Sequence, residues 1–193
     1  MKILALSGST REESFNSRLL DIAVAGARSA GAEVTVVDLK NYDLPLFNQD
    51  FEYHEGAPEA VIQLKDLMIE HQGLLIASPE YNGFPSPLLK NALDWVSRQQ
   101  NDHEPPMFAY KGKIAAVMAA SPGAGGGSRG LTVLRILLQN LGVMALPGQI
   151  TLGRASQAFR EDGRLHDDQL QRAAESLGAD LYDVLLQQST KLD

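Results

Sequence analysis

The sequence predicts a three-layer α/β fold, a five-stranded parallel sheet in the order 2-1-3-4-5 with helices on both faces. Short runs rich in β-branched residues alternate with longer segments whose apolar residues recur at helical spacing. Strands that alternate with helices pair in parallel, and right-handed crossovers leave few topologies. With 193 residues, 44% of them hydrophobic, the chain can bury a substantial core, so a single domain spanning residues 1–193 is expected.

Three of the five strands are predicted in the first half of the chain. The helix after the first strand carries Leu19, Leu20 and Ala23 on one stripe, and Gly31 suits its C-terminal cap. The segment 40–56 shows no regular period and is expected to be irregular. In chain order the predicted elements are strand 2–7, helix 16–30, strand 33–39, helix 58–71 and strand 73–78.

The second half adds two strands and three helices. Asp94 and Arg98 stand four residues apart on the first of these helices, a spacing that predicts an ion pair. The segment His166-Asp167-Asp168 is expected to cap the last helix and to place negative charge at its N-terminus. The predicted elements are helix 87–98, strand 113–120, helix 129–141, a strand that begins at 143–146, and helix 167–188.

The composition argues against several classes of function. The formal net charge of −7 argues against nucleic-acid binding, which needs a basic patch. The absence of cysteine excludes disulfides, thiolate nucleophiles and zinc–thiolate sites, so redox chemistry would require a bound cofactor. The four histidines lack metal-binding spacing, and no metal site is expected. The first strand follows Met1 directly and no apolar stretch could span a bilayer, so a cytoplasmic protein without membrane contacts is expected.

The turn after the first strand is the strongest indication of function. It combines hydroxyl, amide and guanidinium donors with the N-terminus of a helix, whose unpaired N–H groups attract an anion. Its single glycine, Gly8, excludes the dinucleotide fingerprint GxGxxG and the Walker pattern GxxxxGK. Side-chain donors favour a phosphate monoester; the alternative is that Ser14 or Asn16 only caps the helix. The candidate phosphate ligands are Ser9, Arg11, Ser14, Asn16 and Ser17.

Two further loops follow neighbouring strands of the predicted sheet. Prolines, an asparagine and a glycine stiffen residues 78–87, while Tyr81 and Phe84 offer flat apolar surface suited to a planar heterocycle. The alternative is a rigid turn whose aromatic rings face the core. The glycines from Gly123 to Gly127 permit close backbone approach to a ligand, or form a mobile connection. Because ligands bind at the carboxyl ends of parallel strands, the three loops are expected to form one site.

Three motifs together carry a resemblance to a known family. They are Gly8-Ser-x-Arg-x-x-Ser-x-Asn16, Pro79-Glu-Tyr-Asn-Gly, and Leu89-Lys-Asn-Ala-x-Asp-Trp-x-Ser-Arg98. The combination resembles the NAD(P)H-dependent FMN reductase family of flavodoxin-like proteins, which includes quinone, azo-dye and chromate reductases. The resemblance covers nearly the whole chain, and it implies a single flavodoxin-like FMN-binding domain.

Matching positions carry the family's FMN site onto this sequence. The resemblance implies that the FMN phosphate is held by Ser9, Arg11, Ser14, Asn16 and Ser17. The isoalloxazine would be lined, largely through backbone groups, by Pro79, Glu80, Tyr81, Asn82 and Gly83. Its other side would be closed by Ser121, Gly123 and Gly125.

The resemblance also implies an activity. NADPH or NADH would reduce the FMN and leave, and a small acceptor (quinone, azo compound, metal oxyanion or free flavin) would then be reduced in a ping-pong cycle. The flavin carries the chemistry, so no catalytic side chain is required. The family typically forms homodimers or homotetramers. Two other classes remain open: a flavodoxin-type electron carrier without NAD(P)H turnover, and a non-redox protein that uses the fold to bind another phosphorylated ligand or a partner chain.

Overall fold

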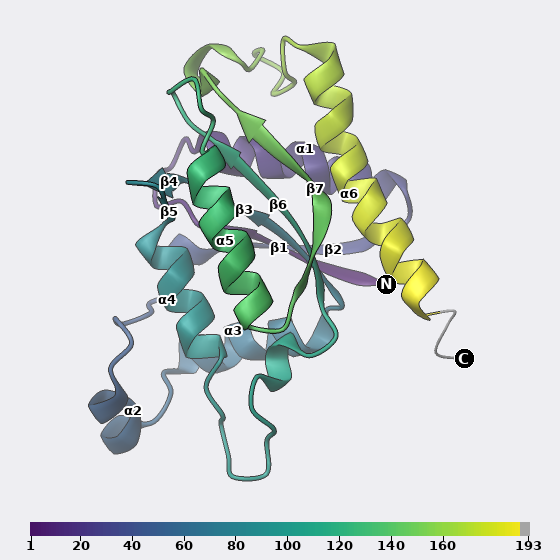
Figure 1. The fold of residues 1–193 in the computed structure, drawn as a ribbon. Helices are drawn as coiled ribbons and strands as arrows, with labels where there is room; N and C mark the ends of the chain where they lie inside the picture. The colour runs from purple at the N-terminus through teal and green to yellow at the C-terminus, as the bar shows by residue number, and fades with distance from the viewer. Residues whose placement is uncertain (190–193) are drawn as a thin grey trace.

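A five-stranded parallel sheet runs through the centre of the molecule (Figure 1). The computed structural model describes residues 1–189. The strands of this sheet are β1 (Lys2–Ser7), β2 (Glu33–Asp38), β3 (Gly73–Ala77), β6 (Ile114–Ala120) and β7 (Met144–Leu152). Their order, β2-β1-β3-β6-β7, is the predicted order 2-1-3-4-5. The fold prediction is confirmed.

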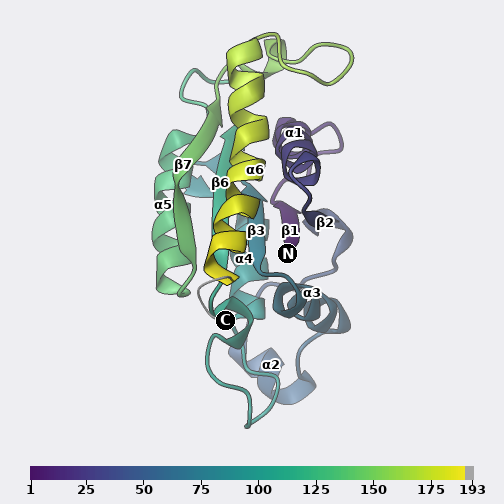
Figure 2. The same ribbon diagram turned by 90° about the vertical axis from the view of Figure 1, so that its right-hand side faces the viewer.

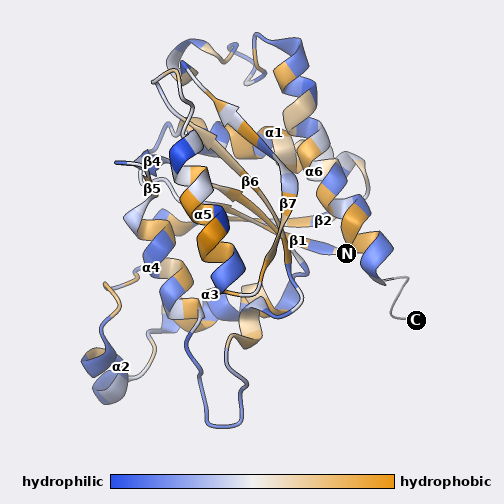
Figure 3. Cartoon of the chain, viewed as in Figure 1, coloured by the Kyte–Doolittle hydropathy of each residue, from blue (hydrophilic) through white to orange (hydrophobic). Residues whose placement is uncertain are grey.

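Helices cover both faces of the sheet, as Figures 1 and 2 show for α5 and α6 on opposite sides of β7. One face is covered by α1 (Phe15–Ser29) and α6 (Asp168–Ser189). The other face is covered by α3 (Glu59–Glu70), α4 (Pro87–Val96) and α5 (Ser128–Asn140). Successive side chains of β1 alternate between the two apolar cores, as do those of β3 and β6. Figure 3 shows β3 and β6 mostly in the hydrophobic colours.

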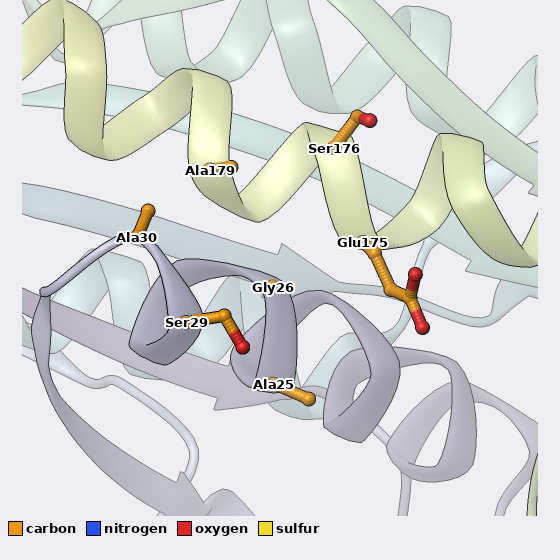
Figure 4. Close-up of a pocket in the computed structure, with 7 residues that line it drawn as sticks. All are labelled: Ala25, Gly26, Ser29, Ala30, Glu175, Ser176 and Ala179. Carbon is orange, nitrogen blue, oxygen red and sulfur yellow. The ribbon is translucent and has the colours of Figure 1, made fainter.

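Helices α1 and α6 approach each other closely at two glycines. A Cβ atom on Gly26 would lie 1.9 Å from the carbonyl oxygen of Glu175, and one on Gly178 would lie 1.9 Å from that of Ala23. A surface hollow follows this contact beside the C-terminal half of α1, away from the predicted phosphate turn (Figure 4). It is lined mostly by small residues: Ala25, Gly26, Ser29, Ala30, Glu175, Ser176 and Ala179.

The segment 40–56, expected to be irregular, contains a helix. A short 3-10 helix, η1 (Leu39–Asn41), is followed by α2 (Gln49–Glu55). Asn48 caps α2, because its Oδ1 accepts hydrogen bonds from the backbone N–H groups of Asp50 and Phe51. A helix of seven residues is too short to show a clear hydrophobic period, so the pattern did not predict it.

Helix α4 holds this segment against the rest of the molecule. Trp95 Nε1 donates to the carbonyl oxygen of Pro45 at 2.7 Å, and Asn91 Oδ1 accepts from the Phe47 N–H at 2.8 Å. The ring of Phe47 also meets that of Trp95 edge-on, with centroids 4.9 Å apart. Asn91 and Trp95 of α4 therefore hold the chain segment between β2 and α3 in place.

The predicted ion pair between Asp94 and Arg98 is wrong. Asp94 pairs with Lys90 at 2.7 Å, and Arg98 Nε pairs with Glu52 of α2 at 2.9 Å. Helix α4 ends at Val96, so Arg98 lies beyond the helical spacing that would bring it to Asp94. The cap predicted for the last helix is confirmed, since Asp167 Oδ1 accepts from two N–H groups of the first turn.

The remaining departures from the predicted elements concern connections. A two-stranded antiparallel hairpin, β4 (Glu80–Tyr81) and β5 (Phe84–Pro85), forms within the loop after β3. Strand β7 runs further than the four residues predicted for its start, and short 3-10 helices occur at η2 (Phe108–Tyr110) and η3 (Ala155–Gln157). Among residues 1–189, no helix has both the length and the apolar character needed to cross a membrane.

Candidate functional site

Three loops meet at the carboxyl edge of the sheet, where they follow the neighbouring strands β1, β3 and β6. Ser86 Oγ donates to the carbonyl oxygen of Gly8 at 2.6 Å and joins the first loop to the second. Asn16 Nδ2 donates to the carbonyl oxygen of Ala120 at 3.0 Å, and Asn16 Oδ1 accepts from the Ala120 N–H at 2.9 Å. This pair of bonds joins α1 to the end of β6. The structure therefore brings together the three segments that the sequence singled out.

The first loop places buried hydroxyl groups beside the N-terminus of α1. Ser9 Oγ accepts from the Arg11 N–H at 3.3 Å, and Ser14 Oγ accepts from the Ser17 N–H at 3.2 Å. Each hydroxyl keeps its own proton to donate. The hydroxyls of Ser17 and Ser7 share a hydrogen bond of 2.8 Å. Ser14 is thus the helix cap considered above, and it stands beside further donors.

Two backbone N–H groups in the first turn of α1, those of Phe15 and Asn16, have no acceptor within residues 1–189. Such groups, together with the helix dipole, form an anion-binding site. The side chain of Asn16 is bonded at both ends to Ala120, so its backbone N–H is what remains for an anion. The geometry fits a phosphate at this helix end.

Arg11 provides a cation beside these donors. Its guanidinium lies over the ring of Phe15, 5.4 Å from the centroid, and that ring stacks on Phe159 with centroids 6.2 Å apart. Arg11 is exposed, and no carboxylate pairs with it in the described part of the chain. Its charge is therefore available to an anionic ligand.

The second loop is the hairpin β4–β5. Its turn residues, Asn82 and Gly83, have φ values of 54° and 87°, the left-handed pair that two-residue hairpin turns require. Tyr81 and Phe84 are 46% and 61% exposed, so the alternative of aromatic rings buried in the core is wrong. Pro79 is partly buried, and its carbonyl oxygen accepts a bond from Ser78 Oγ at 3.1 Å. The hairpin presents flat apolar surface outside the sheet.

The side chain of Glu80 contacts α5. Its Oε2 accepts from the Gly130 N–H at 3.0 Å, and its Oε1 accepts from Arg129 Nη2 at 2.7 Å. The hydrogen bond from Gly130, reinforced by Arg129, holds the pKa of Glu80 below its ordinary value. Because both carboxylate oxygens are engaged, the part of Glu80 available to a ligand beside the hairpin is its backbone.

The third loop, residues 121–127, is tied to the chain after β7. Ala155 N–H donates to the carbonyl oxygen of Ser121 at 3.0 Å, and Arg154 N–H donates to that of Gly123 at 3.1 Å. These bonds argue against the alternative of a mobile connection. A Cβ atom on Gly123 or Gly125 would approach no described atom closer than 3.6 Å. Close packing within the protein does not require glycine at either position, so the absence of a side chain leaves open space there.

Sequence reasoning missed two residues of this region. Ser86 caps α4 through the Leu89 N–H at 3.2 Å while it bonds to Gly8, and its position before Pro87 was an available helix-start signal. Arg129 pairs with Glu80 from 49 positions away, and nothing in the local sequence indicates that pair.

Comparison with known proteins decides the family. A family model described as NADPH-dependent FMN reductase matches residues 1–157. The chain belongs to the NADPH-dependent FMN reductase family. An NAD(P)H-dependent FMN reductase of Pseudomonas aeruginosa is 37% identical over 169 residues, which are 87% of this chain and 86% of that protein. Membership of this family confirms the predictions of an oxidoreductase, of FMN and of NAD(P)H.

The chain is also similar to a quinone oxidoreductase and to a flavoenzyme of known structure. An NADPH:quinone oxidoreductase of Arabidopsis thaliana is 36% identical over 129 residues, covering 66% of this chain and 61% of that protein. The solved structure of a flavoenzyme NAD(P)H:(acceptor) oxidoreductase from Paracoccus denitrificans superposes with a TM-score of 0.74 at 29% identity, covering 94% of this chain and 97% of that one. In open parallel sheets of this kind, ligands bind at the carboxyl ends of the strands, which is the edge described above.

Proposed function

We propose that this chain is one FMN-binding domain that reduces small acceptors with electrons from NAD(P)H. The observation that supports this most directly is the pair of backbone N–H groups, at Phe15 and Asn16, that find no acceptor among residues 1–189 at a helix end surrounded by hydroxyls. When bound, FMN would supply the hydride and electron chemistry, and the chain would bind and orient it.

The first loop would hold the phosphate. Ser9 and Ser14 would donate their free hydroxyl protons, and Arg11 would add a charged hydrogen bond. Ser17 would contribute through its hydroxyl, shared with Ser7, and Asn16 through its backbone N–H. Asn16 would in addition fix the phosphate turn to the end of β6, because its side chain bonds to Ala120.

The other two loops would hold the ring system. The hairpin backbone from Pro79 to Gly83 would meet the polar edge of the isoalloxazine, since the Glu80 side chain is already bonded to α5. Ser121, Gly123 and Gly125 would line the opposite side, where a Cβ atom on either glycine would approach no described atom closer than 3.6 Å. Backbone N–H groups held in this way would stabilise negative charge at the reduced ring.

We propose a ping-pong cycle in which NAD(P)H and the acceptor use the same open face in turn. Relatives named for quinones and for 2-hydroxy-1,4-benzoquinone support a quinone acceptor. Steady-state turnover of the FMN-loaded protein with NADPH and NADH, across quinone, azo, metal-oxyanion and free-flavin acceptors, tests this. Parallel lines in double-reciprocal plots and turnover of at least one class are expected. Intersecting lines would refute the ping-pong order, and no turnover with any acceptor would refute the reductase.

We further propose that two copies pair through an apolar groove between α4 and α5. Ile136 and Phe84 are 55% and 61% exposed there. The groove is lined by Phe84, Pro85, Pro87, Lys90, Val133, Ile136, Leu137 and Asn140. It continues directly into the hairpin, so a homodimer, alone or paired into a homotetramer, would place its interface beside the FMN site.

Light scattering during size-exclusion chromatography tests this pairing. Ile136→Glu is expected to shift the protein toward the monomer, because it places a carboxylate in the apolar groove. Val36→Glu is the matched control, since Val36 is 46% exposed on β2 at the opposite edge of the sheet. A wild-type monomer, or equal effects of the two variants, would contradict the proposal.

A further inference from the structure

Glu80 supplies a hydrogen-bond acceptor that the residues at the N-terminus of α5 do not supply themselves. The cap residue of this helix is Gly127, which has no side chain, and the first turn contains no acidic residue. The carboxylate that meets this turn comes from the hairpin instead: Glu80 Oε2 accepts from the Gly130 N–H at 3.0 Å. A negative charge at this helix end is stabilised by the dipole and by the free N–H groups.

We propose that Glu80 is the positioning residue that fixes the hairpin against α5 and so sets the shape of the ring site. This inference rests on the proposed function, because the ring site is the one described for FMN. The hairpin follows β3, whereas α5 follows the glycine-rich loop 121–127. One carboxylate therefore links the two loops that would lie on either side of the isoalloxazine.

The packing around the carboxylate supports this role. The Glu80 side chain is 12% exposed, although it carries a charge. A Cβ atom on Gly130 would lie 3.1 Å from Glu80 Cγ and 3.2 Å from the carbonyl oxygen of Phe84. The absence of a side chain at Gly130 lets both strands of the hairpin approach the helix.

The two partners of Glu80 contribute unequally. Arg129 is 78% exposed, so solvent screens its attraction to the carboxylate. The Gly130 N–H belongs to the backbone of the first turn of α5, so the helix itself holds its direction. We therefore expect the link to depend mainly on Gly130 and only slightly on Arg129. Glutamine at position 80 would keep an acceptor for Gly130 but lose the charge.

The geometry assigns Glu80 to positioning and not to proton transfer. Both oxygens of the carboxylate already accept hydrogen bonds, one from Gly130 and the other from Arg129. A proton donor beside a reacting ring would need a free, protonated oxygen. The effect of Glu80 is therefore expected in the affinity and midpoint potential of bound FMN, through the backbone from Glu80 to Gly83.

The test compares Glu80→Ala, Glu80→Gln, Arg129→Ala and Gly130→Ala with the control Asp94→Ala. The control breaks an exposed pair with Lys90 on α4 and leaves the hairpin intact. Fluorescence titration gives the FMN dissociation constant, and redox titration gives the midpoint potential. Glu80→Ala is expected to weaken FMN binding by up to about a hundredfold, because the hairpin loses the charged hydrogen bond that fixes it, and to shift the potential.

The relative FMN affinities of the variants distinguish a positioning role of Glu80 from a general loss of stability. Glu80→Gln is expected to bind FMN more tightly than Glu80→Ala, and Arg129→Ala to behave like the control. Gly130→Ala keeps the carboxylate but pushes the hairpin outward, and it is expected to weaken FMN binding even if Glu80→Ala fails to fold. FMN affinity and potential at control values in Glu80→Ala, or in Gly130→Ala if the first does not fold, would overturn the inference.

Amide exchange in the apoprotein distinguishes this inference from the proposed function. The Gly130 N–H is expected to exchange faster in Glu80→Ala than in the control, whether or not FMN is present. If the two variants differ in this way and the wild-type protein binds no FMN, the proposed function is contradicted while the link between hairpin and helix stands. Equal exchange in both variants would overturn the link itself.

Discussion

Substitution of Arg11 removes one charged contact from the first loop without disturbing an ion pair, since no carboxylate pairs with it in the described part of the chain. Arg11→Ala is expected to weaken FMN binding by about tenfold to a hundredfold, because a hydrogen bond to a charged group contributes about 1.5–3 kcal/mol. Fluorescence titration of the apoprotein with FMN measures this. Riboflavin, which lacks the phosphate, should bind both proteins equally.

Arg28→Ala is the matched control for this measurement. Arg28 lies in the last turn of the same helix, where its Nη2 donates to the carbonyl oxygen of Val34 at 3.0 Å. Its removal takes away the same charge at the far end of α1 and is expected to leave FMN affinity unchanged. Equal affinities in Arg11→Ala and Arg28→Ala would place the phosphate elsewhere.

The buried ammonium of Lys113 leads us to expect that the stability of the fold depends on pH, independently of the candidate FMN site. Its ammonium is buried at the start of β6 and donates to the carbonyl oxygen of His71. Burial lowers the pKa of Lys113 from 10.5 to about 8. Between those two values the unfolded chain binds the proton and the folded chain does not, so this residue makes the free energy of unfolding rise with pH across that window.

The variant Lys113→Met lacks this titration. Its stability relative to the wild type is therefore expected to be greatest near pH 8 and to fall as the pH approaches 10.5. Urea unfolding of both proteins at several pH values in that window measures the difference. A difference that stays constant, or grows with pH, would show that the ammonium is not desolvated in the folded state.

At the scale of elements, the contact between α1 and α6 depends on glycine. A Cβ atom on Gly178 would lie 1.9 Å from the carbonyl oxygen of Ala23, so the helices must separate to accept it. Gly178→Ala is expected to lower the free energy of unfolding by about 1–3 kcal/mol, the usual cost of overpacking. Gly148→Ala is the control, because a Cβ atom there would have no neighbour closer than 3.7 Å. Equal stabilities of the two variants in urea would contradict the close contact.

The elements that the sequence predicted well are those with a long apolar period or a buried strand. Strand order and the five long helices followed from the alternation of short apolar strands with longer helical segments, which is clearest where β1, β3 and β6 contribute side chains to both cores. Helix α2 and the hairpin β4–β5 were missed because their signals are local, a cap at Asn48 and the turn pair Asn82-Gly83. The pairs Arg98–Glu52 and Arg129–Glu80 join residues 46 and 49 positions apart, which no local pattern can indicate.

The candidate site was predictable to the level of loops but not of atoms. The three loops were identified because strand ends gather at one edge of a parallel sheet. Sequence reasoning placed Asn16 among the phosphate ligands but could not tell that its side chain bonds at both ends to Ala120, which leaves its backbone N–H for an anion. It also left open whether the Glu80 side chain faces the ring, and the structure shows it bonded to α5. The hydrogen-bond partners that the Asn16 and Glu80 side chains take depend on tertiary contacts.

At the scale of the whole molecule, the sheet places the N-terminus of α1, where we propose that the phosphate binds, beside an aromatic hairpin and a glycine-rich loop on one edge. The groove between α4 and α5 opens beside that edge, so pairing of two copies and binding of an acceptor would occur in the same region. Reduction by NAD(P)H of FMN held in this site is what separates the proposed reductase from a flavodoxin-type electron carrier.

Anaerobic stopped-flow mixing of the FMN-loaded protein with NADPH, and separately with NADH, tests whether these nucleotides reduce the bound flavin. Loss of the flavin's visible absorbance within seconds is expected with at least one nucleotide, followed by its return when a quinone is added. The control is Arg28→Ala, loaded in the same way, which should behave as the wild type. A protein that binds FMN but keeps its absorbance with both nucleotides would contradict the claim and identify a carrier.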